Sequence, residues 1–194
     1  IWDQRDKSGK PPEGFNYGTY HSHDDIRRYV STRDIPPKLG RNRNHGTLVA
    51  SIAAGRKAGS FYGGVAPAAK LLIVKTKSDD EIGYSDAHLE ALKFIDCFAT
   101  DRGWPVVVNL SKGMNAAAHD GRSALEVGFD EFAGGGRKPG RVVVKSAGNE
   151  RDTHVHAEVH VPACGGERLR WLRRRQTSGG ERIELWWSSH DTFT

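Results

Sequence analysis

The chain has 194 residues, of which 37% are hydrophobic and 27% charged, so it is long enough to bury the core of one globular domain. Its two cysteines exclude a disulfide-held scaffold, and they do not form a Cys-x-x-Cys pair of the kind that binds zinc. The net charge of +5 is concentrated in residues 165–182, which hold six arginines and two glutamates.

The first 44 residues are rich in glycine and proline and show no sustained apolar period, which predicts a loop-dominated segment. Residues 46–58 differ, because small and apolar side chains crowd together there. Val49, Ile52 and Ala53 have helical spacing, so we expect a closely packed helix with His45 at its entrance.

Strand and helix patterns then alternate. The apolar run 71–74 predicts a buried strand. Ser85 is the expected N-cap of a helix that ends near Gly103. The apolar face of that helix consists of Leu89, Leu92, Ile95 and Phe98.

A second buried strand is predicted over residues 106–110 and a third over residues 142–144. Between them, Ser123 and Glu126 have the spacing of a capping box, and residues 134–136 are glycines that end the helix it begins. This alternation predicts an α/β fold in which helices flank a right-handed parallel sheet.

The pattern changes after residue 150. Apolar residues fall on alternate positions, which predicts antiparallel strands with one dry face. These residues are Val155, Val159, Val161, Ile183, Leu185 and Trp187. We therefore expect residues 1–150 to form one partial domain and residues 151–194 to begin a β-rich insertion.

Residues suited to acyl-transfer chemistry follow two of the strands. Ser111-Lys112-Gly113 comes after the second strand, and Ser146-Ala147-Gly148-Asn149-Glu150 after the third. Ligands of open parallel sheets bind at such carboxyl ends. With His45 at a helix entrance, the chain has candidates for a general base, a substrate-aligning edge and an oxyanion donor.

Four ordered blocks resemble those of the subtilisin-like serine proteases, peptidase family S8. They are His45-Gly46-Thr47-Leu48-Val49-Ala50, Gly64-Val65-Ala66-Pro67, Val108-Asn109-Leu110-Ser111-Lys112-Gly113 and Ser146-Ala147-Gly148-Asn149-Glu150. Ile1-Trp2-Asp3-Gln4 is similar to a segment that a bacterial branch of this family carries between its catalytic Asp and His. In that branch a β-rich insertion follows the last block.

The resemblance implies a serine endopeptidase that cleaves polypeptides through an acyl-enzyme, without a cofactor, in a secreted or cell-envelope setting. His45 would be the general base and Asn149 the oxyanion donor. Ser111, Lys112 and Gly113 would bind the substrate as an added strand. Leu48 departs from the family, which commonly has a second histidine there.

Two members of the family's catalytic triad are missing from the sequence. No Asp-Ser/Thr-Gly precedes His45, and no Gly-Thr-Ser occurs anywhere. We therefore expect an internal fragment that lacks the triad Asp and Ser and has no peptidase activity by itself. The alternative is a catalytically inactive subtilase fold that serves as a binding or regulatory module.

Other candidate sites have simpler explanations. His154, His156 and His160 would share one strand face, but a solvated polar face explains them equally well, and we predict no metal site. Residues 79–81 are acidic and could contribute to a calcium site, but no complete oxygen cage is identifiable. The arginine-rich stretch is expected to be solvated, so we predict neither a nucleic-acid nor a membrane partner.

Overall fold

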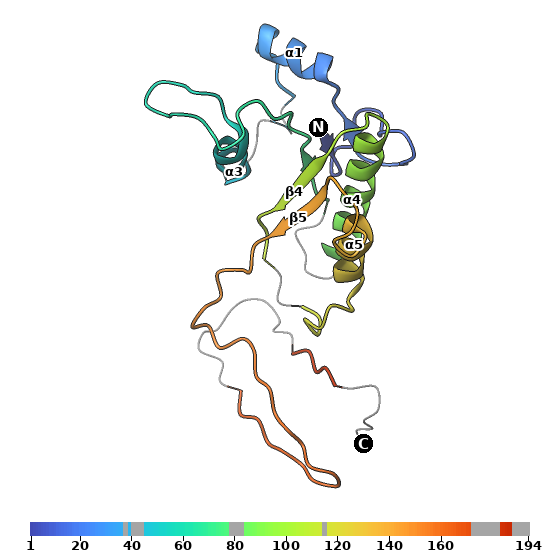
Figure 1. Ribbon diagram of the computed structural model, residues 1–194, viewed down its shortest axis with the longest axis vertical. Coiled ribbons are helices and arrows are strands. Elements are labelled where there is room, and N and C mark those ends of the chain that lie inside the picture. Colours follow the sequence, from blue (N-terminus) through green and yellow to red (C-terminus); the bar gives the residue numbers. More distant parts are fainter. Residues whose placement is uncertain (37–38, 40–44, 78–83, 114–115, 172–182, 188–194) are drawn as a thin grey trace.

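The computed structural model describes residues 1–36, 39, 45–77, 84–113, 116–171 and 183–187. Its strands are β1 (Trp2–Asp3), β2 (Thr19–Tyr20), β3 (Val74–Lys75), β4 (Val106–Leu110) and β5 (Arg141–Lys145). Its helices are α1 (His23–Thr32), α3 (His45–Ala54), α4 (Tyr84–Thr100) and α5 (Ala124–Ala133). Figure 1 shows helices beside small sheets, and this mixed architecture confirms the predicted α/β class.

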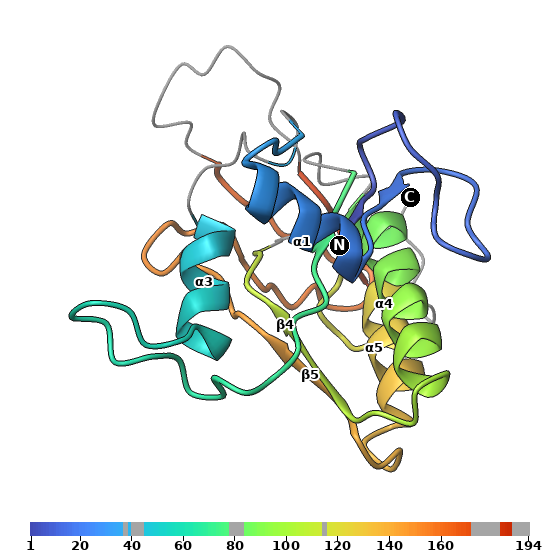
Figure 2. The same cartoon turned by 90° about the horizontal axis from the view of Figure 1, so that it is seen from above.

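Strands β4 and β5 form a parallel two-stranded sheet, separate from the sheet of β1, β2 and β3. Its register runs from Val106 opposite Arg141 to Leu110 opposite Lys145. Val106, Val108 and Val143 pack against the core, where α4 and α5 cover one face of the pair (Figure 2). β4 has its predicted bounds, and β5 is one residue longer than predicted at each end.

The other face of this pair is exposed in the described part of the chain. Val107 is 66% exposed, and Val142 and Val144 are about half exposed. The prediction that these strands are buried on both faces is therefore wrong. In both views α3 lies on this side of the strands, but its own apolar residues Leu48 and Ile52 are also exposed (Figures 1 and 2).

Helix α3 is shorter and less closely packed than its sequence predicted. It ends at Ala54, because the chain turns at Gly55 and folds back on the helix end. Val65 and Ala66 donate backbone hydrogen bonds to the carbonyls of Ile52 and Ala53, at 3.0 and 2.8 Å. The loop over residues 55–66 is thus anchored to the last turn of α3.

The N-terminal segment contains more regular structure than its turn-rich sequence predicted. β1 pairs antiparallel with β2 and parallel with β3, so it lies between them. α1 begins with a capping box formed by Ser22 and Asp25, the same signal that correctly predicted the start of α5. Trp2 of β1 is fully buried and belongs to the main hydrophobic core.

Two boundaries differ from the predictions for local reasons. The strand expected over residues 71–74 is β3 at Val74–Lys75, because those residues face the short partner β1. Helix α4 begins at Tyr84 rather than after an N-cap at Ser85, and it ends at Thr100. Its predicted apolar face is confirmed in part, with Leu92 and Ile95 buried.

The segment after residue 150 forms no strand in residues 151–171 and 183–187, although its alternating pattern predicted strands. Nearly all of these residues are exposed, including Val155 and Trp171. A strand is stable only when its backbone groups pair with a neighbour, and none of the described strands pairs with this segment. The division at residue 150 stays a prediction. None of the described helices is long and apolar enough to cross a membrane.

His21 gives a pH-dependent prediction for the stability of the N-terminal segment. Its ring is buried, and Nδ1 lies 3.1 Å from the Tyr29 hydroxyl, while no described residue forms a hydrogen bond with Nε2. Burial lowers the pKa of His21 below 6.5 because it disfavours the charged form. Just below pH 6.5, His21 therefore binds a proton in the unfolded chain but remains neutral in the folded chain.

We expect the free energy of unfolding to be fully retained above pH 6.5 and to decrease from pH 6.5 toward pH 5, by at most about 1.4 kcal/mol per pH unit. Urea titrations of the wild type and of His21→Phe across this range test it. The variant should show a flatter pH dependence, whereas His23→Phe, at an exposed site, should keep the wild-type slope. Equal slopes in the wild type and His21→Phe would contradict the assignment.

Candidate active site

The carboxyl ends of β4 and β5 bring two of the predicted blocks together. Leu110 and Lys145 are opposite each other at the end of the ladder. One residue further, the backbone N–H of Ser146 donates to the carbonyl of Leu110 at 3.2 Å. Ser111-Lys112-Gly113 and the loop from Ser146 to Glu150 therefore leave the sheet side by side.

Two glycines allow these loops to approach closely. A Cβ on Gly113 would lie 3.6 Å from the Cα of Gly148, which is ordinary contact distance. Gly148 has φ +101°, a conformation that favours glycine, and a Cβ there would lie 2.2 Å from Oε2 of Glu150. Gly113 could therefore accept a Cβ, whereas a side chain at Gly148 would strain the backbone and displace the Glu150 carboxylate.

Polar contacts fix the loop that carries Asn149. The Glu150 carboxylate accepts the backbone N–H of Asn149 at 2.7 Å. Lys145 Nζ donates to the carbonyl of Ser146 at 2.8 Å and also to the carbonyl of Lys112 in the neighbouring loop. The side chain of Asn149 itself is exposed, as an oxyanion donor must be before substrate binds.

The hydroxyl of Ser111 forms a hydrogen bond with a side-chain amide and not with a catalytic base. Its Oγ accepts a hydrogen bond from Nδ2 of Asn109 at 2.9 Å. No described residue places a histidine or carboxylate on this hydroxyl. The role of Ser111 in substrate binding stays a prediction.

His45 is the first residue of α3 and is exposed. Figure 2 shows α3 across the β4–β5 pair from α4 and α5. Within the described residues, no hydrogen bond or ion pair links His45 to Asn149 or to the 111–113 stretch. The structure therefore brings Ser111, Lys112, Gly113 and Asn149 together, and it does not join His45 to them.

Asp3 and Gln4 of the Trp-Asp-Gln segment are buried and make structural contacts. Asp3 forms an ion pair with Lys75 at 2.9 Å and accepts the backbone N–H of Arg5. The Gln4 side-chain amide donates to the carbonyl of Ala87 at 3.0 Å and accepts the N–H of Lys77. These bonds connect β1 to β3 and α4, so the segment has a structural role in the sheet.

The weaker site candidates gain no support from the described residues. Residues 79–81, considered for calcium, lie outside them. His156 stacks on His119 with ring centroids 6.4 Å apart, and no group of three or more His, Cys, Asp or Glu in the described residues could hold a metal ion. In the arginine-rich stretch 165–182, Arg168 and Arg170 are exposed. Residues 172–182 lie outside the described residues.

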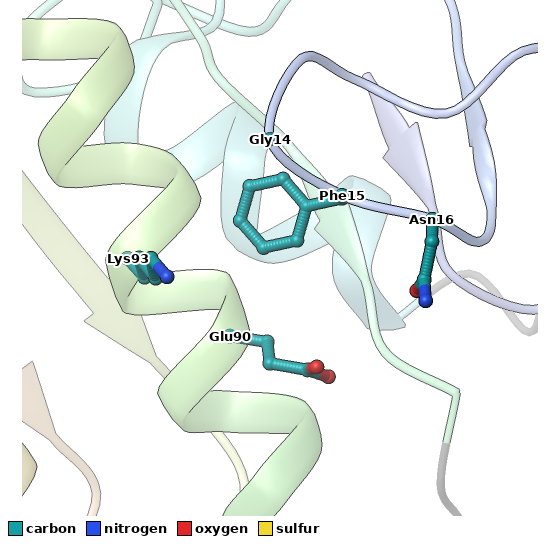
Figure 3. A pocket seen from close by; sticks show the side chains of 5 residues that line it. All are labelled: Gly14, Phe15, Asn16, Glu90 and Lys93. Atoms are coloured by element: carbon teal, nitrogen blue, oxygen red, sulfur yellow. The ribbon is translucent and has the colours of Figure 1, made fainter.

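A separate hollow lies between α4 and the loop over residues 14–16 (Figure 3). Phe15 and Asn16 face Glu90 and Lys93 of α4 across it. None of the predicted site residues lines it. Glu90 is already paired with Lys77 at 3.0 Å and accepts a hydrogen bond from the Tyr17 hydroxyl, so we assign the hollow no part in the candidate site.

Sequence reasoning assigned no role to the side chain of Lys145, which bonds to both loops, or to that of Glu150, which bonds to the backbone of Asn149. Glu150 was part of a recognised block, but its bond to the Asn149 N–H depends on the local turn. Lys145 does carry a sequence signal. It is a charged residue that stands directly between the apolar run 142–144 and the block beginning at Ser146.

Comparison with protein-family models identifies the family to which the chain belongs. The model of the subtilase family, Peptidase_S8, matches residues 15–169, which is most of the chain. The chain therefore belongs to the subtilase family, a family of serine peptidases whose substrates are polypeptides. The search of curated proteins finds no match.

Proposed function

We propose that this chain contributes the general base, the substrate-binding strand and the oxyanion donor of a serine endopeptidase that works through an acyl-enzyme. The observation that carries the proposal is the juxtaposition of Ser111-Lys112-Gly113 with the Asn149 loop at the carboxyl ends of β4 and β5. Substrate edge and oxyanion donor must be adjacent, because the scissile carbonyl lies within hydrogen-bond reach of both.

Ser111 and Gly113 would bind the substrate through their backbone groups. The carbonyls of Leu110 and Lys112 both accept hydrogen bonds from the β5 side, from Ser146 N–H and Lys145 Nζ. Alternate residues of an extended chain direct their backbone groups to opposite edges. Those of Ser111 and Gly113 would therefore face away from β5, where an extended peptide can add as a further strand.

Asn149 would stabilise the negative charge that develops on the carbonyl oxygen during attack. Glu150 holds the backbone of Asn149 and leaves its side-chain amide exposed, so the residue that carries the donor is positioned while the amide is available to the substrate. His45 would take the proton of the nucleophile and later give it to the leaving amine. This role requires the first turn of α3 to approach the nucleophile beside the strand ends.

The triad Asp and the nucleophilic Ser are proposed to lie outside these 194 residues, since neither family block that carries them occurs in the sequence. We expect the purified 194-residue chain to hydrolyse no peptide bonds. A sensitive fluorogenic peptide mixture measures this, and His45→Ala serves as the control for contaminating proteases. Hydrolysis by the chain that disappears in His45→Ala would contradict the prediction.

Sequencing the gene on both sides separates the proposal from its alternative. Asp-Ser/Thr-Gly upstream and Gly-Thr-Ser downstream would complete the triad in the order that subtilases use. Replacement of either residue would instead favour a catalytically inactive fold that binds polypeptides through the same strand edge.

A further inference from the structure

Lys145 is a cation placed where the two loops of the proposed site diverge. It is the last residue of β5, and its ammonium group donates to the carbonyl of Lys112 in one loop and to that of Ser146, at 2.8 Å, in the other. The backbone ladder ends with the bond from Ser146 N–H to Leu110. Lys145 thus extends the connection between the two strands beyond the ladder.

The contact with Lys112 determines how the substrate-binding stretch is presented. A carbonyl held on the β5 side fixes its own peptide plane, and the trans N–H in that plane then points the opposite way. The Lys112 carbonyl shares its plane with the Gly113 N–H, and the Leu110 carbonyl, which accepts from Ser146, shares its plane with the Ser111 N–H. The backbone groups of Ser111 and Gly113 then keep one orientation toward the opposite edge. Without the ammonium, residues 111–113 would lose a charge-assisted hydrogen bond that restricts their rotation.

The contact with Ser146 connects the same cation to the loop of Asn149. Glu150 accepts the Asn149 N–H at 2.7 Å, and its carboxylate oxygens lie 3.8 and 3.9 Å from the position of a Cβ on Gly113. The Glu150 carboxylate also attracts the Lys145 ammonium electrostatically. The cation therefore bonds to both loops, while the anion holds the backbone of Asn149 and attracts the cation.

Resting on the proposed function, we propose that Lys145 is a positioning residue for peptide hydrolysis, which aligns the substrate-binding stretch 111–113 with the oxyanion-donor loop 146–149. It acts through the carbonyls of Lys112 and Ser146 and does not touch the scissile bond. Glu150 supports it by holding the backbone of Asn149.

Backbone amide exchange in the 194-residue chain tests the connection without any need for activity. We expect Lys145→Met to accelerate exchange of the Ser146 and Asn149 amides about tenfold, while amides in the middle of α4 keep their wild-type rates. Lys145→Arg, which retains the charge and the donors, should restore protection. Lys93→Met, at an exposed position on α4, is the matched control. Unchanged exchange in Lys145→Met would overturn the inference.

Hydrolysis by the full-length product of the gene tests the catalytic role. We expect Lys145→Met to lower kcat/KM for a fluorogenic peptide about tenfold, mainly through KM, at an unchanged melting temperature, and Lys145→Arg to recover most of it. An active wild type with an equally active Lys145→Met would overturn the inference alone. A wild type that hydrolyses nothing would overturn the proposed function, whatever the exchange rates show.

Discussion

Replacing His45 by alanine in the full-length product of the gene is expected to lower kcat for peptide hydrolysis roughly a millionfold, the size known for the corresponding change in subtilisin, itself a member of this family. The reason is chemical. At neutral pH a serine hydroxyl is a weak nucleophile unless a base takes its proton as the bond to the substrate forms. The variant should fold as the wild type does, because the His45 side chain is exposed and alanine keeps the backbone of α3 helical.

The chain offers a matched control for this change. His23 is the first residue of α1 and is exposed, as His45 is the first residue of α3, so His23→Ala should retain wild-type kcat. Asn149→Ala should fall between the two, with a loss of about 100- to 1000-fold, a range that also comes from subtilisin. A His45→Ala enzyme with more than a tenth of the wild-type kcat would show that another group is the base.

Elements with strong local signals were predictable from the sequence. The capping box of Ser123 and Glu126 and the left-handed C-cap at Gly134 define α5 without reference to the rest of the chain. β4 was predicted at its observed bounds because an apolar run of strand length lies between turn signals. The meeting of residues 111–113 with the Asn149 loop follows once β4 and β5 are neighbouring parallel strands, because the carboxyl ends of such strands lie at one edge.

Features that depend on distant residues were not predictable. β1 has two residues, too few for any periodic pattern, and exists because β2 and β3 pair with its two edges. The exposure of Val107 and Val142 depends on which elements cover that face, and neither residue carries this information. The position of His45 likewise depends on the packing of α3, whose apolar residues Leu48 and Ile52 are exposed.

The sequence therefore predicted the part of the candidate site formed by the two strand-end loops, but not the placement of His45. Residues that follow neighbouring parallel strands must meet at one edge, so Gly113 and Asn149 could be placed together from strand order. A helix that must bring His45 to the same edge is constrained only by tertiary contacts. The hydrogen bond from Lys145 to the Lys112 carbonyl was not predictable either, because a lysine at a strand end carries no sequence signal for the group that it contacts.

Trp2→Ala is expected to lower the free energy of unfolding by about 3 to 5 kcal/mol. Trp2 is fully buried, with ring centroids 4.6, 5.1 and 5.4 Å from those of Phe15, Phe94 and Tyr17. Its indole N–H donates to the Tyr17 carbonyl at 3.3 Å. Alanine would leave a cavity where β1, the 15–17 loop and α4 meet, and it would leave that carbonyl without its donor.

A loss of this size is a large part of the roughly 5 to 15 kcal/mol that stabilises a typical domain, so the variant should be near its unfolding limit. Urea unfolding followed by far-UV circular dichroism measures the change without relying on the tryptophan removed. Trp2→Phe should lose less than Trp2→Ala, because it keeps an aromatic ring in the cluster, and it remains measurable if the alanine variant does not fold. Trp171 is 57% exposed, so Trp171→Ala should stay within about 0.5 kcal/mol of the wild type. Equal losses in Trp2→Ala and Trp171→Ala would mean that the aromatic cluster around β1 is not the core that holds the N-terminal segment to α4.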